Sequence, residues 1–199
     1  MTTARPAFNV FLVLYALAFG LIAGLGSALW IVKRPYPVGR AEARAWVAWP
    51  QLGASDVDPY SRAILSRSGD IPIGLGEGFP MTATVDDSNR PLEARCTYRL
   101  AGQTPAARFW TLTLYGEDGQ IIENAQERGS FTSAEIVRDE TGRFDIVLAR
   151  QPEPGNWLQM PKEGRVKVVL RLYDTPLSAS LFRLDPAILP SVTREGCES

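Results

Sequence analysis

The middle of the chain reads Phe109-Trp110-Thr111-Leu112-Thr113-Leu114-Tyr115. In an extended chain, its tryptophan and two leucines share one face, while the other face carries aromatic and hydroxyl groups. The segment 166–173 repeats this arrangement, with an aliphatic face and a second face that holds Arg171 and Tyr173. A period of two with one apolar face predicts β-strands. We expect the mixed faces of these strands either to form a polar network inside a β-sandwich or to line a cleft.

Similar short segments succeed one another along the chain and alternate with clusters of turn-forming residues. The other predicted strands are 71–73, 80–85, 94–100, 121–123, 133–138 and 144–149. Many short strands with little helix between them predict a mainly β fold, an antiparallel jelly-roll-like β-sandwich. One short helix precedes them. Asp58 and Pro59 are typical of a helix start, and we expect this helix to end near Arg67 with Tyr60 and Ile64 facing inward.

The N-terminal region contains a long apolar segment, 8–32, in which no residue is charged. At about 1.5 Å per residue, a helix of this length crosses the roughly 30 Å hydrocarbon core of a bilayer. We interpret it as a retained membrane anchor, and a signal peptide cleaved near Ser27 is the alternative. Ala16, Gly20 and Gly24 form a stripe of small residues. Such residues are common in membrane helices, and self-association of two chains through the stripe is the second interpretation.

The orientation of this segment also has two interpretations. Four positive residues come soon after it, whereas only Arg5 and the α-amino group precede it. By the positive-inside rule, this count favours a cytoplasmic domain. The four residues are Lys33, Arg34, Arg40 and Arg44. A short tail before a long apolar run is instead the shape of a signal anchor, which exports the domain on its C-terminal side, and this shape favours the periplasm.

Composition excludes several kinds of chemistry. The chain of 199 residues has a formal net charge of −1, so its charge gives no basis for a nucleic-acid partner. It has no histidine, the commonest general base and zinc ligand, and we expect no metal and no cofactor. Cys96 and Cys197 lack any metal-ligand spacing. We expect a buried thiol at Cys96 and a free thiol in a loose tail at Cys197, because a disulfide would need an oxidising compartment and a tail that reaches back.

Four segments stand in a fixed order along the chain. They are 58–63 (Asp-Pro-Tyr-Ser-Arg-Ala), 109–115, 156–158 (Asn-Trp-Leu) and 170–173 (Leu-Arg-Leu-Tyr). Over about 46–190, the chain therefore resembles the bacterial family known as domain of unknown function 1214. The resemblance implies a jelly-roll-like β-sandwich and no established reaction. Many members carry a second upstream domain, and this chain resembles the short, membrane-anchored form without it.

Candidate ligand-binding residues come from the mixed faces, from the loop at Arg128 and from the segment after Pro154-Gly155. They are Trp110, Thr113, Tyr115, Arg128, Asn156, Trp157, Arg171 and Tyr173. Guanidinium groups suit carboxylates or phosphates, and aromatic rings form stacking platforms for sugars. Each type of residue also has a structural interpretation. The arginines can pair with Glu77, Asp58 or Glu135, and the aromatic rings can belong to the core.

Two further segments are better interpreted as turns than as binding loops. The segment 74–78 is rich in glycine but lacks the Gly-Lys-Ser/Thr of a phosphate loop. Asp86, Asp87 and Asn89 offer oxygen ligands that suit calcium, but they are typical of an acidic hairpin turn.

Together, these observations predict a chain of five parts. They are a tail (1–7), a transmembrane helix (8–32), a juxtamembrane linker (33–45), a β-sandwich domain (46–190) and a flexible tail (191–199). The predicted function is that of a non-catalytic, single-pass protein of the bacterial inner membrane, which binds a ligand, a glycan or a protein through its mixed face. The alternative is an enzyme that acts on a carbohydrate or small molecule, with Glu77 and an aspartate as paired carboxylates.

Overall fold

The computed structural model describes residues 6–33, 39–68, 72–74, 76–122, 124, 126, 128–179 and 184–198. Arg5, Arg34 and most of the predicted N-terminal tail lie outside the described residues. The chain divides into two compact units, and each is described by itself. Unit 1 comprises Met1–Val38 and Val57–Ile71, and unit 2 comprises Gly39–Asp56 and Pro72–Ser199.

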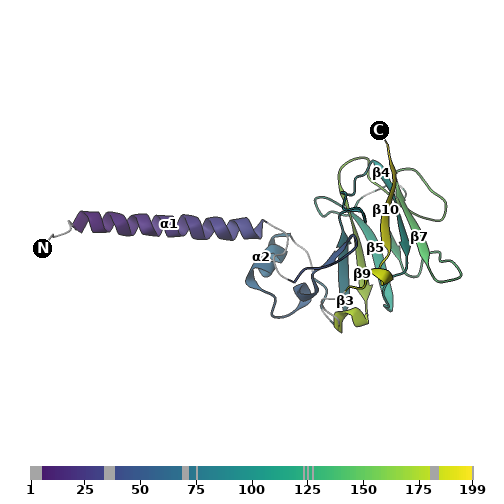
Figure 1. Ribbon diagram of the computed structural model, residues 1–199, viewed down its shortest axis with the longest axis horizontal. Helices are drawn as coiled ribbons and strands as arrows, with labels where there is room; N and C mark the ends of the chain where they lie inside the picture. Colours follow the sequence, from purple (N-terminus) through teal and green to yellow (C-terminus); the bar gives the residue numbers. More distant parts are fainter. Residues whose placement is uncertain are drawn as a thin grey trace. The chain divides into compact units, whose positions relative to one another are not determined.

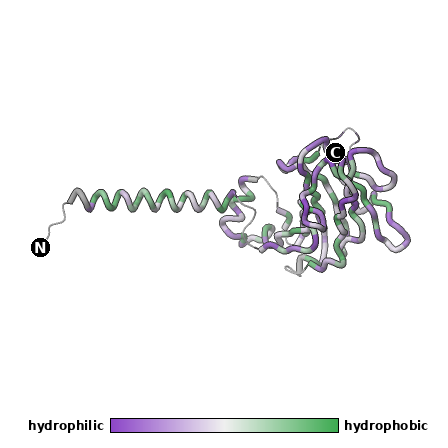
Figure 2. The backbone as a smooth tube through the Cα atoms, turned by 45° about the horizontal axis from the view of Figure 1, so that its top comes forward, coloured by the Kyte–Doolittle hydropathy of each residue, from purple (hydrophilic) through white to green (hydrophobic). Residues whose placement is uncertain are grey.

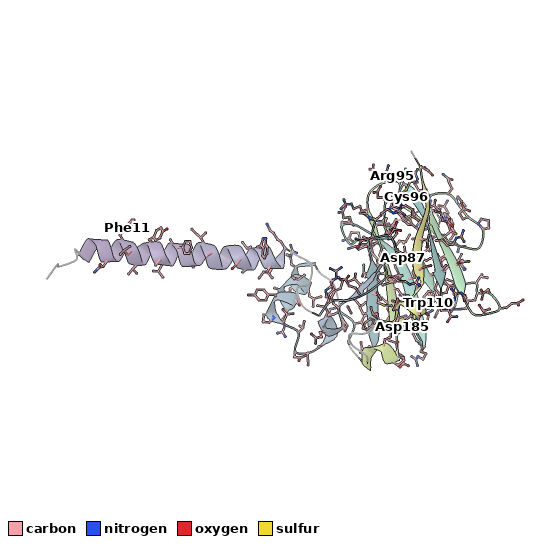
Figure 3. The ribbon with its side chains drawn as sticks, viewed as in Figure 1. Phe11, Asp87, Arg95, Cys96, Trp110 and Asp185 are labelled. Atoms are coloured by element: carbon pink, nitrogen blue, oxygen red, sulfur yellow. A yellow bond between two sulfur atoms is a disulfide. The ribbon has the colours of Figure 1, made fainter. Side chains whose placement is uncertain are left out.

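Unit 1 contains the predicted apolar helix, α1 (Pro6–Val32). Its apolar part, Asn9–Val32, has 24 residues and is about 36 Å long, enough to span a bilayer. No residue of its apolar window is buried against the protein, and Figure 3 shows Phe11 projecting from the helix. By length and composition, α1 suits a membrane anchor or a signal sequence. Self-association through its stripe of small residues stays a prediction.

The second helix of unit 1, α2 (Pro59–Ser68), begins as the sequence predicts. The Asp58 carboxylate accepts hydrogen bonds from the backbone N–H groups of Tyr60 and Ser61, each at 3.0 Å. This satisfies donors of the first turn that have no partner inside the helix. Ile64 is buried as predicted, but Tyr60 is exposed. Ser61 is buried in its place, because residues three apart share one face of a helix.

Unit 2 consists of two β-sheets (Figure 1). The six-stranded sheet has the order β1 (Ala41–Ala43), β2 (Trp46–Ala48), β3 (Gly78–Ala83), β9 (Val166–Tyr173), β5 (Phe109–Gly116), β6 (Ser130–Thr132). The four-stranded sheet has the order β10 (Ser191–Cys197), β4 (Cys96–Gly102), β7 (Phe144–Ala149), β8 (Asn156–Gln159). Three short 3₁₀ helices lie between strands: η1 (Pro50–Gly53), η2 (Pro176–Ala179) and η3 (Pro186–Ile188).

One hydrophobic core draws side chains from both sheets. The alternate residues of β5 and β9 that the sequence assigns to an aliphatic face are all buried in it. Leu170 of β9 pairs with Met81 of β3 and Leu112 of β5 in the middle of the larger sheet, and all three are fully buried. Figure 2 shows hydrophobic segments along the strands of unit 2 and hydrophilic segments in its loops. The prediction of a mainly β fold with two sheets is therefore confirmed.

One strand pair differs from the predicted antiparallel arrangement. β8 runs parallel to β7, with Asn156 beside Ile146. The side-chain amide of Asn156 donates to the backbone oxygens of Val137 and Asp145, at 2.8 and 2.9 Å. These bonds hold the start of β8 beside the start of β7, so the chain runs back along β7 before it enters β8.

Two segments that the sequence places outside the domain form strands. The predicted linker contains β1, which pairs with β2 and buries the small side chains of Ala41 and Ala43. The predicted flexible tail contains β10, which pairs with β4 along its length. Val192 is the only buried side chain of β10. The apolar alternation that marks a strand is therefore missing from its sequence.

Three predicted strands also need correction. Residues 133–135 form a turn and 136–138 have no regular structure, because the side chain of Asn156 takes both backbone groups of Val137. Pro72 and Ile73 are not in a strand, and Ile71 lies outside the described residues. Ile121 forms only an isolated bridge with Tyr115, and 123 lies outside the described residues.

A disulfide joins Cys96, the first residue of β4, to Cys197, the last residue of β10. The two residues face each other in the register of the strand pair. Figure 1 shows the C-terminus at the end of β10, beside β4. Cys96 is buried as predicted, but the expectation of a free thiol at Cys197 is wrong. The predicted tail reaches back because it is itself a strand of the sheet.

Candidate functional site

The mixed faces of β5 and β9 lie on the outside of the six-stranded sheet, not inside the sandwich as expected. The residues of this surface, here called the mixed face, are Pro80 and Thr82 of β3, Lys167, Val169, Arg171 and Tyr173 of β9, Phe109, Thr111, Thr113 and Tyr115 of β5, and Ser130 and Thr132 of β6. Their neighbours along each strand point into the core. The mixed face is therefore neither an internal network nor the lining of a cleft.

Strand register arranges the mixed face in rows across the sheet. One row runs Thr82, Val169, Thr113, Ser130, and the next runs Pro80, Arg171, Thr111, Thr132. Neighbouring strands lie about 4.8 Å apart, so hydroxyl groups recur at short intervals across the surface. Each hydroxyl can both donate and accept a hydrogen bond. The surface thus offers many donors and acceptors along the sheet.

Arg171 lies at the centre of the mixed face and contacts Tyr115. Its Nη1 donates to the Tyr115 hydroxyl at 3.0 Å, and its guanidinium carbon lies 5.3 Å from the centre of the Tyr115 ring. Thr111 faces Arg171 in the register, and Tyr115 is four residues further along β5. The guanidinium therefore reaches along the sheet, over the row of Val169 and Thr113. A cation above an aromatic face is held electrostatically while its other N–H groups stay available.

A pair of aromatic rings occupies one end of the mixed face. Phe109 and Tyr173 face each other in the register, and their ring centres lie 5.9 Å apart with a tilt of 39°. Phe109 is exposed and Tyr173 is half-buried. The expected pairing with Glu77 or Glu135 is wrong for Arg171, whereas the charge of Arg128 contributes to the lowered pKa of Glu135. Among the residues that the structure describes, the partner of Arg171 is an aromatic phenol rather than a carboxylate.

Trp110, a predicted ligand-binding residue, belongs to the core. Its side chain is buried, and its ring centre lies 5.5 Å from that of Phe144. The Arg138 guanidinium lies 5.7 and 5.6 Å from these two rings. The indole therefore packs between the sheets and cannot take part in the mixed face, which belongs to the opposite side of its strand.

Asn156 and Trp157 lie away from the mixed face, and Arg128 lies in the segment just before β6. Asn156 is buried and holds the backbone of Val137 and Asp145. Trp157 lies on the outer side of the four-stranded sheet, where its Nε1 donates to the backbone oxygen of Ala149 at 3.0 Å. The Arg128 carbonyl accepts a hydrogen bond from the Gln159 N–H at 2.8 Å. Of the eight predicted residues, the structure brings together four: Thr113, Tyr115, Arg171 and Tyr173.

A second surface feature lies at one end of the four-stranded sheet. β7, β8 and β10 end at this side of the sheet, because β8 is parallel to β7 and both β7 and β10 are antiparallel to β4. Residues at or just beyond these strand ends line an open pocket of about 380 Å³, here called the strand-end pocket. They are Arg150, Gln151, Gln159, Met160, Lys162 and Glu198.

The strand-end pocket leaves no signal in the sequence, because its residues come from segments far apart in the chain. β8 and β10 are not visible as strands in the sequence, so nothing there predicts that 150–151, 159–162 and 198 meet. If both strands and their directions relative to β7 could be predicted, the sequence would predict that these segments meet. The predicted sites instead lie on the two segments whose alternation is clear.

Carboxyl groups give no support to the paired-carboxylate alternative. Among the carboxyl groups of the described residues, five have a shifted pKa, and in each the pKa is lowered: Asp58, Asp86, Glu93, Glu135 and Asp139. For Glu135 the main cause is a hydrogen bond from the Thr132 hydroxyl, and for Glu93 it is one from Arg95. A lowered pKa keeps a carboxyl ionised, whereas a general acid in glycoside hydrolysis needs a raised one.

The two segments interpreted as turns are turns in the structure. In 74–78, the N–H groups of Glu77 and Gly78 donate to the Gly74 oxygen. The Asp86 carboxylate accepts hydrogen bonds from the N–H groups of Ser88 and Arg90 within the hairpin after β3. Across the described ranges, no group of three or more cysteine or acidic side chains is placed to hold a metal ion.

These features define a class: a mainly β, two-sheet domain in a chain that also carries one apolar N-terminal helix. The model of the family "Protein of unknown function (DUF1214)" matches residues 77–177. The chain belongs to this family. The match begins just before β3 and ends within η2, so it contains all of the mixed face.

Two solved structures are similar to this chain. The VPA0106 protein from Vibrio parahaemolyticus has 17% sequence identity and a TM-score of 0.57, over 98% of this chain and 47% of that protein. An uncharacterised protein from Burkholderia cenocepacia has 17% identity and a TM-score of 0.39, over 90% of this chain and 51% of that protein. The chain thus spans about half the length of either structure. No curated protein matches it closely enough to be called a relative.

Proposed function

We propose that this protein is a non-catalytic binding module, anchored by α1 in the inner membrane of a bacterium with unit 2 on the periplasmic side. We further propose that the mixed face binds an extended acidic glycan. The observation that carries the binding role is the position of Arg171, a cation without a carboxylate partner in the described part of the chain, between rows of hydroxyl groups and an aromatic pair.

The periplasmic side is supported by the disulfide between Cys96 and Cys197. Disulfides persist in oxidising compartments such as the periplasm and are rare in the reducing cytosol. Because the disulfide joins two paired strands, the folded domain itself holds the two cysteines together. A cytoplasmic domain would keep both cysteines reduced.

The count of positive charges still opposes this orientation, since Lys33, Arg34, Arg40 and Arg44 closely follow the apolar segment and only Arg5 and the α-amino group precede it. The disulfide is the stronger argument for the direction, because it needs an oxidising compartment, whereas long domains are exported largely regardless of their charge.

The chemistry of the mixed face suits a glycan better than a protein partner. Protein interfaces rely on large aromatic and aliphatic anchors at their centre. The centre of the mixed face holds Arg171, the buried Val169 and threonine hydroxyls, and the only large exposed hydrophobic side chain among its residues is Phe109. Sugar rings have apolar faces that stack on aromatic rings and hydroxyls that pair with threonine. A guanidinium binds the carboxylate of an acidic sugar through two hydrogen bonds.

The side of the membrane is tested by fusion of alkaline phosphatase to the C-terminus, next to β10. We expect an active enzyme, since alkaline phosphatase matures only after export, together with an intact N-terminal segment in the mass of the purified protein. An inactive fusion that becomes active only when α1 is inverted would place the domain in the cytoplasm and contradict the proposal.

The binding role is tested with the full chain in nanodiscs and three immobilised polymers: polygalacturonate, alginate and neutral dextran. We expect binding to the acidic polymers and not to dextran. Arg171→Gln should weaken it by about 10-fold or more, the usual effect of a lost hydrogen bond to a charged group. The matched control is Arg143→Gln, which removes the same charge from an exposed turn. Equal losses in both variants would reduce the effect to general charge attraction and contradict the proposal.

A further inference from the structure

Gln159, which lines the strand-end pocket, carries a polar group without a partner. The side-chain oxygen Oε1 of Gln159 is buried and accepts no hydrogen bond from the part of the chain that the structure describes. A buried acceptor without a donor costs free energy, so such a group points to a donor supplied from outside the chain. Gln159 is the last residue of β8, and its backbone N–H is already bonded to the Arg128 oxygen.

The same pocket is positively charged on one side. Arg150 and Lys162 both line it, and Arg150 Nη1 donates to the Lys162 oxygen at 3.3 Å, which fixes the guanidinium at the rim. The other terminal nitrogen of Arg150 pairs with the carboxylate of Glu198. Met160, which is buried, gives the pocket an apolar wall. A volume of about 380 Å³ is in the range of pockets that hold small molecules.

Glu198 shows which chemical group the pocket accepts. It comes directly after Cys197, and its backbone N–H donates to the Arg95 oxygen at 2.9 Å, so the disulfide and this bond place it at the pocket. Its side chain is free to rotate away, because 60% of its surface is exposed. An exposed ion pair is weak and exchanges readily. The chain therefore holds one of its own carboxylates where a carboxylate from solution can take its place.

We propose that the strand-end pocket binds a small organic acid that carries a hydroxyl group, such as a sugar acid or a hydroxy acid. The ligand carboxylate replaces that of Glu198 on Arg150, Lys162 adds a second cation, and a ligand hydroxyl donates to Gln159 Oε1. This site lies on the other sheet from the mixed face and does not depend on the glycan proposal.

The test is isothermal titration calorimetry of the full chain in nanodiscs with three probes: glucuronate, glucose and acetate. We expect glucuronate to bind, and both glucose and acetate to bind at least about 10-fold more weakly, because each lacks one of the two groups that the pocket recognises. Acetate binding as tight as that of glucuronate, or no heat with glucuronate, would overturn the proposal.

Variants separate this site from general electrostatics. Glu198→Gln should tighten glucuronate binding by up to about five-fold, because it removes the competing carboxylate. Tighter binding cannot result from misfolding of the variant. The control Glu195→Gln removes the same charge from the same end of the chain, where Glu195 pairs with Arg99 instead. It should leave binding unchanged. Equal gains in both variants would overturn the proposal.

Two further variants separate this site from the mixed face. Arg150→Gln and Gln159→Leu should each weaken glucuronate binding by about 10-fold, and Arg171→Gln should not change it. If Arg171→Gln abolished glucuronate binding while Arg150→Gln left it unchanged, the ligand would belong to the mixed face. This result would overturn the proposal for the strand-end pocket.

Discussion

The carboxylate of Asp86 lies 3.2 Å from Nε of Arg194 and joins the hairpin after β3 to the last strand of the chain. Asp86 is 1% exposed and Arg194 13%, so this ion pair is buried. Arg194 also donates to the Pro91 oxygen and lies above the Tyr98 ring. Asp87, the next residue, accepts from the N–H groups of Ala45 and Val192, so the two aspartates together connect both sheets.

Asp86→Asn should destabilise the protein at neutral pH by about 3 kcal/mol, because it leaves Arg194 without its buried partner. Burial alone would raise the pKa of Asp86, but the N–H groups of Arg90 and Ser88 and the charge of Arg90 outweigh it, and the pKa is lowered. A lowered folded-state pKa means that the stabilisation is present above the ordinary value of 3.8 and is lost as pH falls through the folded-state pKa.

The measurement is chemical denaturation in micelles between pH 3 and pH 7, monitored by tryptophan fluorescence. We expect the wild-type protein to lose stability towards the acid end more steeply than Asp86→Asn does. Glu140→Gln, an exposed control, should keep the wild-type profile. Parallel profiles for wild type and Asp86→Asn would show that this carboxylate does not stabilise the fold.

Cys197→Ser should lower the free energy of unfolding by about 4 kcal/mol. The disulfide closes a loop with a sequence separation of 101 residues, and a loop of roughly this length restricts the unfolded chain strongly. Cys197 is the better cysteine to replace because it is exposed, whereas Cys96 is part of the core. Reductant should destabilise the wild-type protein and have no effect on Cys197→Ser. Equal sensitivity of both proteins to reductant would contradict this assignment.

The strands that the sequence predicts correctly are those with an apolar residue at every second position. β5 buries three alternate side chains and β9 buries four, and their predicted faces are the observed ones. β10 has a single buried side chain and is held by pairing, by the disulfide and by Arg194. Such long-range partners leave no periodic trace in the sequence, which therefore predicts a tail in place of β10.

The candidate site is predicted in part for the same reason. Alternation places Thr113, Tyr115, Arg171 and Tyr173 on one face of two strands, and the sheet keeps them together. Alternation does not say which face is inward when both are partly apolar, so residue type alone groups Trp110 with them although it lies in the core. Asn156 has the sequence context of a turn residue after Pro-Gly but is buried in a strand. Its three hydrogen bonds, not its neighbours in sequence, determine its place.

Asn156→Asp should destabilise the fold by about 3 kcal/mol at pH 8, because a charged oxygen would face the carbonyl oxygens of Val137 and Asp145. The folded state would favour the neutral form of the new carboxyl group, so its folded-state pKa would be raised above its unfolded-state pKa. The penalty should therefore shrink as pH falls, which is the opposite of the effect at Asp86. Melting temperatures at pH 5 and pH 8 measure this difference. Asn156→Ala should show a penalty that does not change with pH.

Arg171→Gln and Trp110→Ala separate a surface role from a core role among the predicted ligand-binding residues. Arg171 is half-buried and bonded to one phenol, so its loss should cost about 1 kcal/mol or less. Trp110 is 2% exposed and packs on Phe144, so Trp110→Ala should cost about 3–5 kcal/mol. Chemical denaturation gives both values, and pull-down on polygalacturonate measures binding under conditions in which each variant is folded. We expect Arg171→Gln to be stable and weak in binding, because its side chain serves the mixed face. A large loss of stability in Arg171→Gln would instead make it a structural residue, and its effect on binding would then say nothing about a glycan site.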